Sequence, residues 1–143
     1  MLVQDSIYDR FVPLFVKATE AFKVGPPEES DTFQGPQVSK LQFEKILGYI
    51  EAGKTGGAKL LTGGSRHGSK GYFVKPTVFG DVTMNMKIGQ EEIFGPVASL
   101  IRFKDEAEAI AIANNSEVRT FTVLFADGST AWPRRCIHRT SAR

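Results

Sequence analysis

Apolar residues near the start of the chain recur at intervals of three, four and seven, which predicts an amphipathic helix over residues 6–22. This apolar face consists of Ile7, Phe11, Leu14, Phe15, Ala18 and Phe22. Ser6 followed by Asp9 resembles a capping box, whose side chains bind N–H groups of the first helical turn. Pro13 removes one helical hydrogen bond and is expected to kink the helix, and Gly25-Pro26-Pro27 ends it.

The same spacing returns after a polar loop that runs through Gly35-Pro36 and predicts a second helix. Its apolar positions are Val38, Leu41, Ile46, Leu47 and Ile50. Ser39 has the side chain of an N-cap residue, because its hydroxyl can accept from a first-turn N–H group. The glycines within residues 53–57 are expected to fray the other end.

Short apolar runs in the middle of the chain predict strands. Residues 58–61 fit a short buried strand, and the glycine-rich segment 63–71 fits a turn. Residues 72–79 are aromatic and β-branched, as is typical of a strand. Pro76 lacks an N–H group, so this strand is expected either at a sheet edge or with a break in its pairing.

The last third of the chain begins with a regular pattern and then loses it. Residues 97–103 alternate as in a strand, and Asp105 is placed to cap a helix over residues 106–115. Residues 118–125 fit another strand, whereas residues 126–143 have no period and predict disorder. The order of helices and strands indicates an α/β fold without a complete doubly wound unit.

Composition restricts the class of protein further. The 143 residues are 41% hydrophobic and 24% charged, which is typical of a globular domain. No apolar run approaches the length of about 18 residues that a membrane helix needs, and the first ten residues lack a signal-peptide pattern. Cys136 is the single cysteine, so an intrachain disulfide is excluded. We expect a cytoplasmic protein, with the mitochondrial matrix as the alternative.

Charge is distributed unevenly between the two parts of the chain. Residues 1–117 carry a net charge of −2, whereas residues 118–143 carry +4, with five arginines and no lysine. A basic end of this kind is found in arms that bind nucleic acid or other partners. Few aromatic residues accompany these arginines, so we expect no nucleic-acid partner.

Three other patterns predict no site. Residues 63–70 resemble a phosphate-binding loop, but Ser69 stands where the lysine belongs and a strand follows, so an ordinary turn is expected. Cys136 and His138 lack a patterned scaffold that would orient a nucleophile and a base. His67 has no second metal ligand nearby and fits a surface histidine.

The most informative segment is 89–96, which reads Gly-Gln-Glu-Glu-Ile-Phe-Gly-Pro. In the simplest interpretation Glu91 and Glu92 are solvated loop charges and Phe94 is a core residue. In the alternative, a carboxylate accepts hydrogen bonds from a sugar diol while the phenyl ring packs on a heteroaromatic face. The residue chemistry by itself favours the first interpretation.

Residues 91–97 resemble the phenylalanine-bearing motif of the NAD(P)-dependent aldehyde dehydrogenase superfamily. Five further segments resemble the same family in the same order: residues 32–38, 43–50, 56–61, 71–79 and 113–116. The resemblance covers about residues 2–117. It implies an α/β fold that is part of the catalytic domain, with an incomplete three-layer sheet.

The resemblance also implies an NAD site and an activity. Glu92 resembles the carboxylate that holds the nicotinamide-side ribose, and Phe94 the ring packed near the nicotinamide. Gln42 and Lys45 resemble helix residues that reach the same ribose, although Gln42 could instead complete a capping box with Ser39. Family members oxidise an aldehyde to a carboxylate through a thiohemiacetal on a cysteine and form oligomers, so we expect an aldehyde substrate and a homo-oligomer.

The resemblance predicts two segments with different properties. Residues 1–117 are expected to be part of the catalytic domain, and residues 118–143 a divergent tail that is disordered or results from a reading-frame slip. The nucleophile and general base of the family are expected upstream of residue 1, so the polypeptide should be inactive. The alternative is a non-catalytic binding protein that uses the basic tail. An incomplete domain should also expose Phe11, Phe15 and Ile46.

Overall fold

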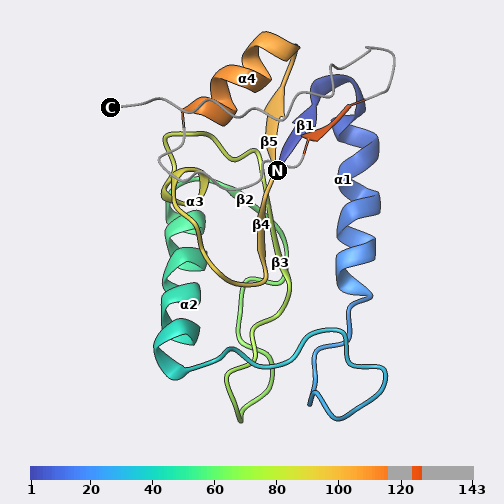
Figure 1. Cartoon of the computed structure of the whole chain (residues 1–143), viewed down its shortest axis with the longest axis vertical. Coiled ribbons are helices and arrows are strands. Elements are labelled where there is room, and N and C mark those ends of the chain that lie inside the picture. Colours follow the sequence, from blue (N-terminus) through green and yellow to red (C-terminus); the bar gives the residue numbers. More distant parts are fainter. Residues whose placement is uncertain (116–123, 127–143) are drawn as a thin grey trace, which may run out of the picture.

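The computed structural model describes residues 1–115 and 124–126. Its elements, in chain order, are β1 (Leu2–Gln4), α1 (Asp5–Glu20), α2 (Lys40–Thr55), β2 (Lys59–Thr62), β3 (Thr77–Gly80), α3 (Lys87–Gln90), β4 (Val97–Ser99), β5 (Ile101–Phe103), α4 (Glu106–Asn114) and β6 (Leu124–Phe125). Helices α1 and α2 lie on opposite sides of the strands (Figure 1). The described residues therefore have the α/β, three-layer arrangement that the sequence predicts.

The strands form two three-stranded sheets. One sheet has the order β5-β1-β6 with parallel pairs, and the other has the order β2-β3-β4. In the second sheet β3 pairs antiparallel with β2 and parallel with β4. Side chains alternate across the layers: Val3 and Val78 pack in the cluster beside α1, whereas Leu2 and Phe79 belong to the cluster that includes α2.

The single strand predicted over residues 97–103 is two strands that belong to different sheets. Leu100 lies at the change: its N–H donates to the Phe79 carbonyl at 2.9 Å, and its own carbonyl accepts from the Val82 N–H at 3.1 Å. The next N–H, of Ile101, instead donates to the Met1 carbonyl at 2.9 Å. The alternating pattern predicted extended backbone correctly but contains no information about which neighbour each half pairs with.

Helix α1 begins one residue before the predicted start and ends two residues before the predicted end. The capping box was wrong: Gln4 occupies the N-cap position and makes no side-chain cap bond, while Ser6 is already the second helical residue. The reason is that β1 runs directly into the helix. Pro13 lies inside α1, as expected.

Helix α2 confirms the predicted cap. The Ser39 hydroxyl accepts from the Gln42 N–H at 3.2 Å. The predicted apolar face was wrong at its start, because Val38 is 91% exposed and Leu41 is 78% exposed. Val38 precedes the helix, and Leu41 lies five residues, or about 140°, around it from the buried Ile46.

Pro76 lies directly before β3. The strand begins at Thr77, immediately after the proline, and all four of its residues are buried. It lies in the centre of its sheet, so the break in pairing is observed and the edge position was wrong. The preceding turn is joined to it by Thr77, whose hydroxyl oxygen accepts from the Gly64 N–H at 2.9 Å.

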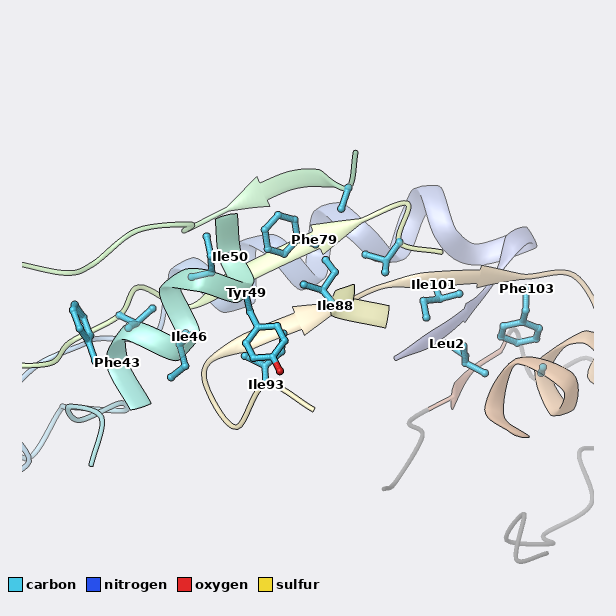
Figure 2. Close-up of a cluster of buried hydrophobic side chains, with 14 residues drawn as sticks. Leu2, Phe43, Ile46, Tyr49, Ile50, Phe79, Ile88, Ile93, Ile101 and Phe103 are labelled. Carbon is cyan, nitrogen blue, oxygen red and sulfur yellow. The ribbon is translucent and has the colours of Figure 1, made fainter. Parts of the chain in front are cut away.

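The hydrophobic core runs between α2 and the strands and continues to β1, β5 and α4 (Figure 2). Ile46 is completely buried, so its expected exposure was wrong. Phe11 and Phe15 are partly buried against the smaller cluster beside α1, with ring centres 5.4 Å apart. The described layers cover these side chains because α1 and α2 each retain a sheet face to pack against.

The C-terminal part of the described chain contains α4 and β6. The Asp105 carboxylate accepts from the Glu108 N–H at 2.9 Å and caps α4, as predicted. Leu124 and Phe125 form a short strand beside β1, within the strand predicted over residues 118–125. The predictions for the rest of residues 116–143, including Cys136 and His138, lie outside the described residues apart from Ala126. In the described part, no helix is both long enough and apolar enough to cross a membrane.

Candidate functional site

The Glu91–Gly95 loop lies against one face of α2. Gln42, Ile46 and Tyr49 occupy this face, because residues three, four and seven positions apart lie on the same side of a helix. Figure 2 shows Tyr49 and Ile46 on the helix with Ile93 nearby in the loop. Each of the three α2 residues contacts a different part of the loop.

Gln42 binds the loop through its side-chain amide. The Nε2 group donates to the carbonyl of Phe94 at 2.8 Å and to that of Ile93 at 3.2 Å. The backbone N–H of Gln42 donates to the Ser39 hydroxyl, so one half of a capping box is also present. The side chain itself therefore serves to hold the loop.

Tyr49 binds the other end of the loop. Its ring is buried, and its hydroxyl donates to Glu91 Oε2 at 2.7 Å. The hydrogen bond to Glu91, followed by burial, raises the pKa of the Tyr49 phenol. The ammonium groups of Lys45 and Lys87 lie 5.9 and 5.0 Å from the ring centre, within range of a cation–π interaction.

Close packing holds the loop between these two bonds. The Ile93 side chain is 8% exposed and belongs to the main core cluster. Gly95 lies so close to α2 that a Cβ atom there would be 2.5 Å from Cδ1 of Ile46. Phe94 has a φ angle of +51°, which is uncommon for a residue with a side chain, and its side chain is 66% exposed. The expectation that Phe94 is a core residue is therefore wrong for this fold.

The Glu92 carboxylate differs from that of Glu91 because it has no bonding partner among the described residues. The residue is half-buried, and no hydrogen bond or ion pair joins its side chain to any part of residues 1–115 or 124–126. A carboxylate has two oxygens that accept hydrogen bonds, and a vicinal diol offers two O–H donors. Glu92 lies two residues before Phe94, whose exposed ring has the chemistry to pack on a flat heterocycle.

The structure brings the four residues implied by the resemblance to one region, where they make different contacts. Gln42 contacts the backbone of Phe94, and Glu92 lies in the same loop. Lys45 is exposed on α2 next to Tyr49. Tyr49 was not predicted as a site residue, although its position seven residues after Gln42 on the same helical face was an available signal.

Within the described residues, the glycine-rich turn and His67 form no comparable site. The 63–71 turn leads to an isolated bridge between Arg66 and Val74 and then to β3, so the strand–loop–helix order of a phosphate-binding loop is not formed. His67 is exposed, as expected. Within the part of the chain that the structure describes, no cluster of three His, Cys, Asp or Glu side chains could hold a metal ion.

Solved structures of known proteins share this fold. The aldehyde dehydrogenase of Bacillus cereus in complex with NAD+ is 49% identical, with a TM-score of 0.78 over 80% of this chain and 23% of that chain. The Mycobacterium tuberculosis aldehyde dehydrogenase complexed with NAD+ is 44% identical, with a TM-score of 0.77 over 80% of this chain and 24% of that chain. The fold is thus that of one part of an α/β oxidoreductase.

Sequence comparison agrees with the fold. An aldehyde dehydrogenase of Emericella nidulans is 60% identical over 117 residues, which are 82% of this chain and 24% of that protein. Aldehyde dehydrogenase family 2 member C4 of Arabidopsis thaliana is 56% identical over 117 residues, 82% of this chain and 23% of that protein. The model of the aldehyde dehydrogenase family matches residues 1–138. The chain belongs to the aldehyde dehydrogenase family and spans about a quarter of the length of these relatives.

Proposed function

We propose that this chain provides the nicotinamide–ribose side of an NAD+ site in an aldehyde dehydrogenase. The observation that carries the proposal is the half-buried carboxylate of Glu92, which has no partner among the described residues and lies two residues before the exposed Phe94. The residues fit this ligand because carboxylate oxygens accept from a diol and a phenyl ring packs on a flat heterocycle. NAD+ bound in the two similar structures supports the same cofactor here.

Each of the four residues has a separate role in this proposal. Glu92 accepts hydrogen bonds from the ribose hydroxyls, and Phe94 packs near the nicotinamide. Lys45 extends from α2 toward the same ribose. The Gln42 amide nitrogen is engaged with loop carbonyls, which leaves its amide oxygen as the group that accepts from a ribose hydroxyl.

The reaction of the whole enzyme is the oxidation of an aldehyde to a carboxylate, for which bound NAD+ supplies the hydride acceptor. The chain's own contribution is to bind and orient the cofactor. We propose a homo-oligomeric, cytoplasmic enzyme, with the family's cysteine forming the thiohemiacetal. The 143-residue polypeptide should not turn over aldehyde, because its single thiol, Cys136, lies in a sequence unlike that around the family's nucleophile.

The binding proposal is tested on the 143-residue chain by ligand-observed NMR with NAD+ and with nicotinamide mononucleotide. Both should show saturation transfer, and Glu92→Ala should weaken binding about tenfold or more, because hydrogen bonds to a charged group are lost. Glu28→Ala, at an exposed position in the loop between α1 and α2, is the matched control. Absence of transfer in the unaltered chain, or equal binding by Glu92→Ala, would contradict the proposal.

The expected lack of turnover needs a separate measurement. Purified chain is mixed with acetaldehyde and NAD+, and the absorbance of NADH is followed against a reaction without protein. We expect no difference between the two. Formation of NADH above the blank would show that the polypeptide contains a complete catalytic apparatus.

A further inference from the structure

Glu92 lies between residues that α2 holds on both sides. On the N-terminal side, Glu91 accepts the Tyr49 hydroxyl bond at 2.7 Å. On the C-terminal side, Gln42 donates to the carbonyls of Ile93 and Phe94. The Glu92 side chain thus has no bond to the described residues, while α2 holds the side chain of the residue before it and the backbone carbonyls of the two residues after it.

Attaching the neighbouring residues to α2 lowers the conformational entropy that the loop loses when a ligand binds. A glutamate on a free loop must lose backbone and side-chain freedom when it binds a ligand, and this loss weakens the complex. Attachment of the neighbouring residues removes part of that loss before the ligand arrives. The left-handed backbone of Phe94 indicates that the surrounding contacts determine the loop conformation, because this conformation is unfavourable for a residue with a side chain.

The Tyr49 side chain is well suited to hold Glu91. Its ring is 7% exposed and is packed in the main core cluster, so the hydroxyl has a well-defined position. The acceptor is a carboxylate, and hydrogen bonds to charged groups are stronger than those between neutral groups. Lys45 and Lys87 contact the ring itself, whereas the hydroxyl is directed to Glu91.

We propose that Tyr49 is a positioning residue for the cofactor carboxylate. Its hydroxyl fixes Glu91, and Glu91 in turn fixes the backbone from which Glu92 presents its oxygens to the ribose diol. This role rests on the proposed function, since it concerns the same NAD+ site. Tyr49 itself does not touch the ligand.

The test compares Tyr49→Phe with Tyr72→Phe in the 143-residue chain. Tyr72 is a suitable control because it is 40% exposed and its hydroxyl has no hydrogen-bond partner among the described residues. Tyr49→Phe should weaken NAD+ binding about three- to tenfold, the size expected for a typical single hydrogen bond, because the bond acts on the ligand only through the position of the loop. Tyr72→Phe should leave the affinity unchanged. Equal affinity of Tyr49→Phe and the unaltered chain would overturn the proposal.

A spectroscopic measurement without ligand separates positioning from general destabilisation. In ¹⁵N NMR spectra, Tyr49→Phe should broaden or shift the amide signals of residues 91–94, while signals of β1 and α4 stay in place. Glu91→Ala should produce the same local change, and adding Tyr49→Phe to it should have no further effect, because the two residues act through one bond. Additive effects would contradict the proposed route.

The two proposals fail in different ways. If the unaltered chain does not bind NAD+, the proposed function fails, and the amide signals still decide whether Tyr49 orders the loop. If the chain binds NAD+ but Tyr49→Phe changes neither the amide signals of residues 91–94 nor the affinity for NAD+, only the positioning role fails.

Discussion

Two glycines next to the same helix differ in what a methyl group would contact. Gly95 of the loop has Cδ1 of Ile46 at 2.5 Å from an added Cβ, whereas Gly48 within α2 has nothing within 4 Å. Ile46 is completely buried, so it has little space into which to move. The first glycine is therefore needed for close packing, and the second only weakens the helix.

Gly95→Ala should lower the free energy of unfolding by about 1–3 kcal/mol, the usual effect of overpacking a core. Gly48→Ala should raise it by about 0.5–1 kcal/mol, because alanine is favoured over glycine inside a helix. Urea unfolding followed by circular dichroism measures both. Destabilisation of similar size in the two variants would contradict the packing argument.

Tyr49 gives the protein a defined pH dependence at alkaline pH. The bond to Glu91, together with burial, raises the pKa of the phenol above its usual value of 10.0. A raised pKa means that the folded state holds the phenolic proton more tightly than the unfolded state does. The stabilisation is therefore complete below pH 10 and is lost as the pH rises through the raised pKa.

The difference in unfolding free energy between the unaltered chain and Tyr49→Phe should thus stay constant from neutral pH to about pH 10 and shrink above it. Urea unfolding at a series of pH values measures this difference, and Tyr72→Phe serves as the control. A difference that disappears between pH 6 and 9 would instead show that another group controls the bond.

Helix α2 shows which properties of an element follow from local chemistry. Its start was predicted correctly from Ser39, because an N-cap bond involves only neighbours in the chain. Its buried residues were predicted only in part, since Val38 and Leu41 are exposed. Tyr49 was missed for a related reason: a tyrosine between Ile46 and Ile50 fits a core position, and the pattern does not show where its hydroxyl points.

Ser39→Ala should lower the free energy of unfolding by about 1 kcal/mol through loss of the cap. Ser39→Asp keeps an acceptor at the N-cap and adds a negative charge near the helix N-terminus, so it should stay close to the unaltered chain. Thermal and urea unfolding measure both variants. If the two variants were equally unstable, the cap bond would not be the cause.

Arg102 of β5 connects parts of the molecule that are distant in sequence. Its guanidinium bonds Asp5 and Asp9 of α1 at 3.2 and 3.0 Å and Asp81 after β3 at 3.3 Å, and it lies 3.5 Å from the centre of the Tyr8 ring. Burial opposes the charged form, but the three carboxylates outweigh it and raise the pKa of Arg102. This network joins the two sheets to α1.

Arg102→Gln should lower the free energy of unfolding by about 1–2 kcal/mol at low ionic strength, and by less in 1 M salt, because the group is partly exposed. Lys40→Gln removes an exposed pair with Glu44 at 3.6 Å and should cost about 0.3–0.5 kcal/mol. Urea unfolding at two salt concentrations measures how much the unfolding free energy of each variant depends on salt. If the loss of unfolding free energy in Arg102→Gln does not depend on salt, the loss comes from the packing of Arg102 on the Tyr8 ring.

The positions of α1, α2 and α4, the caps at Ser39 and Asp105, and family membership follow from residues close together in the chain, and these could be predicted before the structure was known. The division of residues 97–103 between two sheets and the bond between Tyr49 and Glu91 required the tertiary structure. The physical reason is separation along the chain. A repeating pattern specifies which face of an element is buried, whereas the partner of a side chain 42 residues away depends on how the layers pack.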